Sequence, residues 1–250
     1  MEKLIELKNV SKTYKMGKIE TVALNNINLT VNKGEILVIL GSSGSGKTTL
    51  LNVISGLDRM DANEEHKSFK ITKRNKNSYI KYNNTDISKY SDLRMTLFRK
   101  KKLGFIFQTY NLLEHLNVRE NVLVGSKLGN SKANIDKIID LVGLTKHKKK
   151  YMHELSGGEQ QRVSIARALA KEPEVMFCDE PTGALDEKTG KKVLECLVEA
   201  NEKMGTTLII VTHNPGIALI GDKVIKMNSG KIVEEIINKK RTNPKDIPWG

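Results

Sequence analysis

Short apolar runs along this chain predict the buried strands of a parallel sheet. The runs contain no polar position and cover residues 36–40, 175–178 and 208–211. Strands that are apolar throughout are typical of a sheet covered on both faces. Apolar residues recur at helical spacing after the first run, at Leu50, Val53, Ile54 and Leu57. Mostly apolar residues at 224–227 and apolar residues at 232–233 flank Asn228-Ser229-Gly230, which predicts a closing antiparallel hairpin.

The middle of the chain has a helical pattern instead. Ile135, Ile138, Ile139 and Val142 mark one amphipathic helix. Residues 160–171 mark another, which Glu172-Pro173 ends. We therefore expect one domain over residues 1–236. Its α/β core takes in about residues 1–90 and 172–236, a helical subdomain is inserted at about 91–171, and a basic tail follows at 237–250.

Residues 59–84 depart from both patterns. They are rich in Lys and Asn, with scattered apolar and aromatic side chains at Phe69, Ile71, Tyr79, Ile80 and Tyr82. We expect a long, mobile excursion such as an extended hairpin. A tolerated surface insertion explains it better than a partner contact does.

Charge and composition narrow the class of protein. The net charge is +13, but the basic residues fall in separate short runs, as solvated faces usually do. Aromatic residues make up only 5% of the chain, and no motif that reads RNA or DNA interleaves them with the basic runs. Attraction to an anionic membrane surface is as good a use of this charge as binding to nucleic acid.

The chain shows neither a signal-peptide pattern at its start nor an apolar run of about 20 residues, the length that spans a bilayer. Cys178 and Cys196 lack metal-ligand spacing. We expect reduced, packed thiols in a cytosolic setting.

The octet GSSGSGKT, between the first strand and the first helix, matches the phosphate-loop pattern. Its glycines let backbone N–H groups converge on phosphate oxygens at a helix N-terminus. Lys47 would contact the β- and γ-phosphates, and the Thr48 hydroxyl would ligate Mg²⁺. The predicted nucleotide-binding residues here are Gly41, Ser42, Ser43, Gly44, Ser45, Gly46, Lys47, Thr48 and Thr49.

Two carboxylates, Asp179 and Glu180, follow the second apolar run. Asp179 lies where a carboxylate would hold Mg²⁺ through a water, and Glu180 is placed to act as general base toward the attacking water. An acidic pair after a strand is also a common turn feature, so the phosphate loop is what favours the catalytic interpretation.

Together these motifs resemble the nucleotide-binding subunit of ATP-binding-cassette (ABC) transporters, over about residues 4–236. The octet resembles the Walker A motif, residues 175–180 resemble Walker B, and residues 155–162 (LSGGEQQR) resemble the family signature. The resemblance implies an α/β P-loop NTPase core with a mixed, mostly parallel sheet, an antiparallel β element and an inserted α-helical subdomain.

The resemblance also implies roles for individual residues. Gln108, after Phe105-Ile106-Phe107, matches the glutamine that touches Mg²⁺ and the water. His213 matches the histidine that contacts the γ-phosphate, and Tyr14 the aromatic that stacks on adenine. Asp186 would contact the opposing subunit, and Ser156, Gly157 and Gly158 would cover the ATP of a second copy. Without the family, a plain helix cap would explain Ser156 better.

The implied function is ATP hydrolysis with Mg²⁺ in a head-to-tail dimer, coupled to an integral membrane permease at the cytoplasmic face. Within the family, residues 56–58, 105–108 and 180–186 look most like one subgroup, which includes macrolide-exporter, lipoprotein-releasing and antimicrobial-peptide-transport ATPases. Two other classes stay open, namely a soluble ABC ATPase acting on DNA and a non-hydrolysing module that regulates a partner by binding ATP. Neither a long coiled coil nor a zinc module interrupts the sequence, and Glu180 and His213 are both present.

Overall fold

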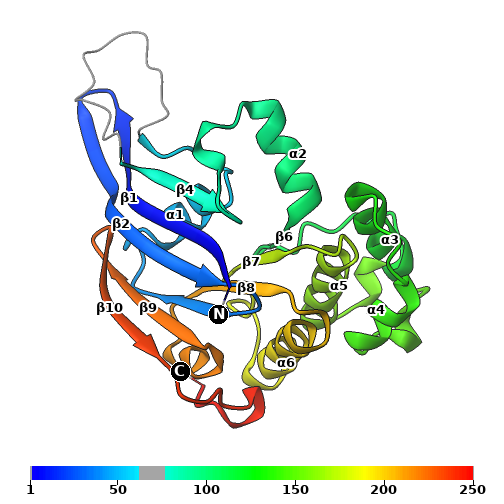
Figure 1. Cartoon of the computed structure of the whole chain (residues 1–250). Helices are drawn as coiled ribbons and strands as arrows, with labels where there is room; N and C mark the ends of the chain where they lie inside the picture. Colours follow the sequence, from blue (N-terminus) through cyan, green and yellow to red (C-terminus); the bar gives the residue numbers. More distant parts are fainter. Residues whose placement is uncertain (1, 62–76, 250) are drawn as a thin grey trace.

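The computed structural model describes residues 2–61 and 77–249, which form two β-sheets and six α-helices (Figure 1). The central sheet runs in the order β10 (Lys231–Ile237), β9 (Lys223–Asn228), β3 (Ile36–Leu40), β8 (Thr207–Thr212), β7 (Val175–Asp179) and β6 (Leu103–Ile106). The strands from β9 to β6 are parallel, and β10 pairs antiparallel with β9. The predicted α/β fold with a mostly parallel sheet is confirmed, and so is the closing hairpin.

The second sheet is antiparallel, with the order β2 (Ile19–Asn32), β1 (Lys3–Met16), β4 (Tyr79–Tyr82) and β5 (Thr85–Asp86). In Figure 1 its two long strands, β1 and β2 (blue), lie beside the central sheet. This sheet is the predicted antiparallel element.

The antiparallel sheet corrects one prediction. Residues 79–82, assigned above to a mobile excursion, form β4, whose Ile80 and Tyr82 are buried and paired with Leu7 and Ile5 of β1. Their alternating apolar pattern is that of a strand with one covered face. The part of the excursion at residues 62–76 lies outside the described residues.

The helices are α1 (Lys47–Ile54), α2 (Asp92–Lys102), α3 (Val118–Gly129), α4 (Ile135–Leu141), α5 (Gly157–Leu169) and α6 (Glu187–Met204). Short 3-10 turns lie at Ile87–Lys89, Thr145–His147, Met152–Glu154, Pro215–Ile220 and Pro244–Asp246. None of the helices in the described part of the chain is long and apolar enough to cross a membrane.

The central sheet is covered on both faces, and its residues alternate between them. Leu37 and Ile39 of β3 pack in one apolar cluster with α1 and the antiparallel sheet. Ile36 and Val38 pack in the other, which the helices α3 to α6 complete. This three-layer arrangement explains why the strands read as uninterrupted apolar runs.

Side-chain caps fix where the later helices begin. Ser156 caps α5 in a reciprocal box with Glu159, and Asp186 caps α6 by accepting from Thr189 N. The predicted helix at 160–171 is therefore α5, which begins earlier, at Gly157. The first helix also differs from the prediction, because Gly56 adopts φ +67° and α1 ends at Ile54, before Leu57.

The boundaries of the helical region differ from the expected range of 91–171. That range contains β6, a strand of the central sheet, and α2, whose Phe98 packs edge-on against Tyr82 of β4. The helices α3, α4 and α5 share one apolar cluster and lie together beside the sheet (green to yellow-green in Figure 1).

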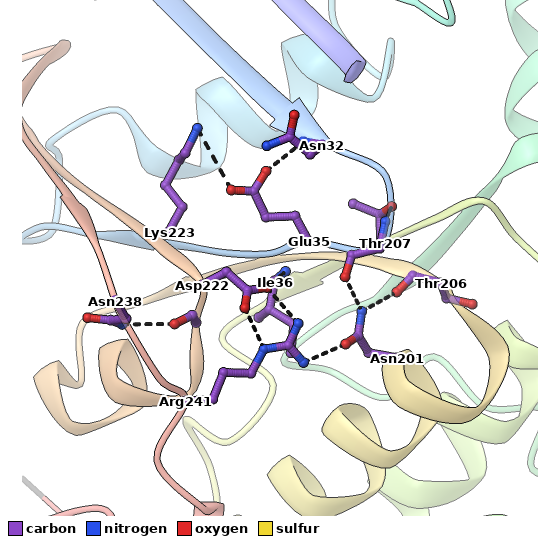
Figure 2. Close-up of polar contacts among 12 residues, drawn as sticks. Asn32, Glu35, Ile36, Asn201, Thr206, Thr207, Asp222, Lys223, Asn238 and Arg241 are labelled. Atoms are coloured by element: carbon purple, nitrogen blue, oxygen red, sulfur yellow. Dashed lines mark hydrogen bonds and ion pairs between the residues drawn. The ribbon is translucent and has the colours of Figure 1, made fainter. Parts of the chain in front are cut away.

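The segment after β10 also differs from the expected basic tail, because it folds back onto the domain (Figure 2). The Arg241 guanidinium donates to both carboxylate oxygens of Asp222 at 2.7 and 2.6 Å, and to Asn201 Oδ1 at 2.6 Å. Asp222 Oδ2 accepts from Ile36 N at 2.8 Å. Ile247 is buried beyond this anchor. Residues 238–249 are thus part of the packed structure.

Candidate nucleotide-binding site

The phosphate loop connects β3 to α1 and depends on glycine geometry. Gly44 and Gly46 adopt φ +76° and +100°, a region that other residues rarely occupy. A Cβ at Gly46 would lie 2.5 Å from Ala23 O of β2. Gly46 directly precedes α1, so the free N–H groups of the first helical turn follow the loop. This is the arrangement that binds phosphate groups in other proteins.

Lys47 opens α1 and is held by the loop itself. Its side chain is mostly buried, and Nζ donates to Ser42 O at 2.8 Å. Ser45, also buried, donates its N–H to Ser42 O at 3.2 Å. Its hydroxyl oxygen has no hydrogen-bond partner among the described residues. The loop thus places a lysine cation and a free polar atom beside the start of the helix.

Two further polar side chains come from the ends of adjacent parallel strands. Glu180 follows β7 in a left-handed conformation, with φ 48°, and its N–H donates to Val211 O of β8 at 3.0 Å. His213 follows β8, and its Nδ1 lies 2.9 Å from Glu180 Oε1. Carboxyl ends of neighbouring parallel strands are where ligands bind in open α/β sheets. The strained backbone of Glu180 turns its carboxylate to this edge.

Asp179, the last residue of β7, has the chemistry of a cation ligand. Its Oδ1 is buried without a hydrogen-bond partner among the described residues. Burial and the neighbouring Glu180 charge raise the pKa of this carboxyl, while the Thr48 hydroxyl and Lys47 oppose the shift. A partly buried carboxylate oxygen beside a hydroxyl is a donor set that suits a hard cation such as Mg²⁺.

The phosphate loop, Glu180 and His213 meet in one open cavity of about 530 Å³, a volume within the range of small-molecule sites. Ten of the predicted site residues line it: Tyr14, Ser43, Gly44, Gly46, Lys47, Thr48, Thr49, Gln108, Glu180 and His213. Four other predicted site residues are not among those that line it: Gly41, Ser42, Ser45 and Asp179. Tyr14 comes from β1, and Gln108 follows β6. The structure therefore brings together side chains that are up to 199 positions apart in the sequence.

The cavity also has walls that the sequence did not reveal. Thr21, Val22 and Ala23 of β2 and the turn residues Ser229 and Gly230 line it. The Asn228-Ser229-Gly230 turn was visible only as a hairpin. Its approach to β2, seen in the bond from Asn25 N to Gly230 O at 2.8 Å, had no local signal.

The signature residues and Asp186 do not line this cavity as described. Ser156 Oγ accepts from Glu159 N at 3.4 Å and lies 2.9 Å from Glu159 Oε2. Gly158 packs so closely on α6 that a Cβ there would lie 1.9 Å from Thr189 Cγ2. Asp186 accepts from Thr189 N at 3.1 Å. Within one chain Ser156 and Asp186 cap two helices, and Gly158 packs the two together.

Comparison with known proteins agrees with the geometry. The sequence profile described as "ABC transporter" matches residues 24–183. The putative ABC transporter ATP-binding protein MG065 homolog of Mycoplasma pneumoniae is 42% identical over 99% of this chain, which spans about half (51%) of that relative. The bacitracin export ATP-binding protein BceA of Halalkalibacterium halodurans is 39% identical over 93% of this chain and 88% of its own length.

A solved structure is similar over nearly the whole fold. It is the dimeric, post-hydrolysis state of the ATP-binding cassette MJ0796, from Methanocaldococcus jannaschii, bound to ADP and Pi. The TM-score is 0.78 at 34% identity, covering 95% of this chain and all of that one. The predicted resemblance is confirmed: the chain belongs to the ABC transporter family and is one of its ATP-binding domains.

Proposed function

We propose that this chain hydrolyses ATP between two copies of itself and thereby drives a membrane permease of the export or mechanotransmission type. The observation that carries the proposal is the contact between Glu180 and His213, 2.9 Å apart, in a cavity that also contains the phosphate loop. A carboxylate held by an imidazole beside a phosphate site has the geometry of a general base for water attack.

The residues of the cavity divide the chemistry among them. Lys47 and the N–H groups at the start of α1 bind the phosphate oxygens. Glu180 accepts the proton of the attacking water, and His213 orients the carboxylate and faces the terminal phosphate. Gln108 contacts the same water, and Tyr14 packs against the base.

The site also fits Mg²⁺, which would be held by Thr48, Asp179 and Gln108. Their oxygen atoms are of the kind this ion prefers, and Asp179 Oδ1 lacks a protein partner among the described residues. The ion supplies charge neutralisation at the β- and γ-phosphates.

The second half of the site comes from a second copy. Ser156 caps helix α5 outside the cavity, and Gly157 and Gly158 begin the helix, with N–H groups suited to an anion. The similar MJ0796 cassette forms a dimer bound to ADP and Pi, which supports a paired arrangement here. Asp186, at the start of α6, would contact the opposing copy.

The partner is proposed to be an integral membrane permease, with this chain at the cytoplasmic face of the membrane. The relative BceA is named as a bacitracin export protein, which supports the export type. The net charge of +13 suits a position near an anionic membrane surface.

Phosphate release by the purified chain tests hydrolysis. The Glu180→Gln variant keeps an oxygen that can accept from His213 but cannot take up a proton. We expect its turnover to fall at least about 100-fold, with ATP binding retained. The matched control is Glu187→Gln, an exposed position on α6, with turnover unchanged. Near wild-type hydrolysis by Glu180→Gln would contradict the general-base role.

A further inference from the structure

Asp58, which does not line the cavity, forms a hydrogen bond with Tyr14, which does. Tyr14 is 42% exposed on β1, and an exposed aromatic side chain would ordinarily exchange between rotamers. Its hydroxyl, however, donates to Asp58 Oδ2 at 2.7 Å. The ring is therefore fixed at its far end.

Asp58 is itself held from several sides. Lys12 Nζ donates to Asp58 Oδ1 at 3.0 Å, with a lysine side chain that is only 3% exposed. Arg59 N donates to the same oxygen at 2.7 Å. Lys12 Nζ also lies 5.1 Å from the centre of the Tyr14 ring, within the range of a cation–π contact. Lys12, Tyr14 and Asp58 thus form one connected group.

The protonation of this group suits the contact. Burial opposes the charge of Asp58, but the hydrogen bonds from Tyr14, Lys12 and Arg59 N outweigh it and lower the pKa of this carboxyl. Burial and the bond to Asp58 raise the pKa of Tyr14. At neutral pH the phenol is the donor and the carboxylate is the acceptor.

The chain path links this group to the phosphate loop. The phosphate loop lies at the start of α1, and Asp58 lies just after its end. The Asp58 N–H donates to Asn52 O of the helix at 3.1 Å. One short helix therefore fixes both the phosphate loop and the partner of Tyr14.

We propose that Asp58, supported by Lys12, is a positioning residue that holds the Tyr14 ring against the base of a bound nucleotide. Asp58 would then set the affinity for the nucleoside part of ATP and leave the affinity for the phosphates unchanged. The proposal rests on the proposed function, because it requires that the cavity bind ATP.

The test compares ATP, ADP and inorganic tripolyphosphate, each with Mg²⁺, by isothermal titration calorimetry on the full chain. Tyr14→Phe keeps the ring and removes the tether. Asp58→Ala removes the tether from the other side. A matched control is Asp61→Ala, because Asp61 accepts from Thr13 N at 2.8 Å in the same turn but does not hold Tyr14.

We expect each tether variant to weaken ATP and ADP binding about three- to tenfold, the range of one hydrogen bond. Tripolyphosphate binding and the control should be unchanged. The double variant should bind ATP as tightly as the single variant with the lower ATP affinity, since both substitutions remove the same contact.

Nucleotide affinity that is unchanged in Tyr14→Phe and Asp58→Ala would overturn the proposal, as would an equal loss for tripolyphosphate. Because Tyr14→Phe leaves the Lys12–Asp58 ion pair in place, its result does not depend on that pair's contribution to folding. Failure of the wild-type chain to bind ATP would overturn the proposed function as well.

Discussion

Replacing Gly158 by alanine tests whether packing inside one chain fixes the signature segment. The new methyl would lie 1.9 Å from Thr189 Cγ2, whereas carbon atoms pack at about 3.5–4.0 Å. Thr189 cannot turn away freely, because its side chain is β-branched and its N–H bonds to Asp186 Oδ1. The helices α5 and α6 must therefore move apart, and overpacking of this kind costs about 1–3 kcal/mol. The better helix propensity of alanine returns at most about 1 kcal/mol.

The matched variant is Gly157→Ala, one residue earlier. Its methyl would meet the Tyr110 hydroxyl at 2.9 Å, the free end of a side chain that can shift. Thermal and urea unfolding would measure both. An approach of 1.9 Å places the cost in the upper part of this range, so the net loss is about 1–2 kcal/mol. At about 2–4 °C per kcal/mol for a chain of this length, we expect Gly158→Ala to lower the melting temperature by about 2–8 °C. Gly157→Ala should leave it within about 2 °C. Equal melting temperatures for Gly158→Ala and the wild type would refute the packing argument.

Two other substitutions test stability and metal binding. Arg241→Ala should lower the free energy of unfolding by about 1–2 kcal/mol in urea titrations, because a partly exposed bidentate contact with Asp222 is lost. Arg241→Lys should recover only part of this loss. Wild-type stability for Arg241→Ala would show that the C-terminal segment is not anchored there. Asp179→Asn should raise the melting temperature of the nucleotide-free chain, because the raised pKa of Asp179 means that its ionised carboxyl is disfavoured in the folded state. The same substitution should weaken Mg²⁺-dependent ATP binding in calorimetry. A lower melting temperature together with an unchanged Mg²⁺ dependence would contradict both predictions.

The parts of the fold that could be predicted are those with a local signal. The strand β3 is apolar throughout, and β7 and β8 contain the apolar runs 175–178 and 208–211, because both faces of the sheet are covered. The phosphate loop is a continuous octet between a strand and a helix. Glu180 and His213 could be placed because each directly follows one of these strands. Their 2.9 Å contact follows from the adjacency of β7 and β8.

The parts that could not be predicted depend on contacts between distant segments. Tyr79–Tyr82 pairs with β1 across more than 70 positions, and its Lys- and Asn-rich surroundings hid the alternating pattern. Asp58 is an ordinary turn residue in the sequence and gains its role only where α1 ends beside β1. The C-terminal segment looked like a basic tail because the partner of Arg241, Asp222, lies 19 positions earlier in the sequence, before β9.

The central claim is that Ser156 of one copy covers the ATP of another, and the most direct measurement is the mass of the Glu180→Gln chain by light scattering with ATP. Ser156→Arg is added in the same background, with Asn134→Ala, which removes the cap of α4, as a control for cap loss. We predict that Glu180→Gln and the control reach twice the 28.0 kDa of one chain. The Ser156→Arg chain should bind ATP with the same affinity and stay at 28.0 kDa. An ATP-dependent dimer that forms despite Ser156→Arg, or an ATP-bound Glu180→Gln chain that stays monomeric, would contradict the account.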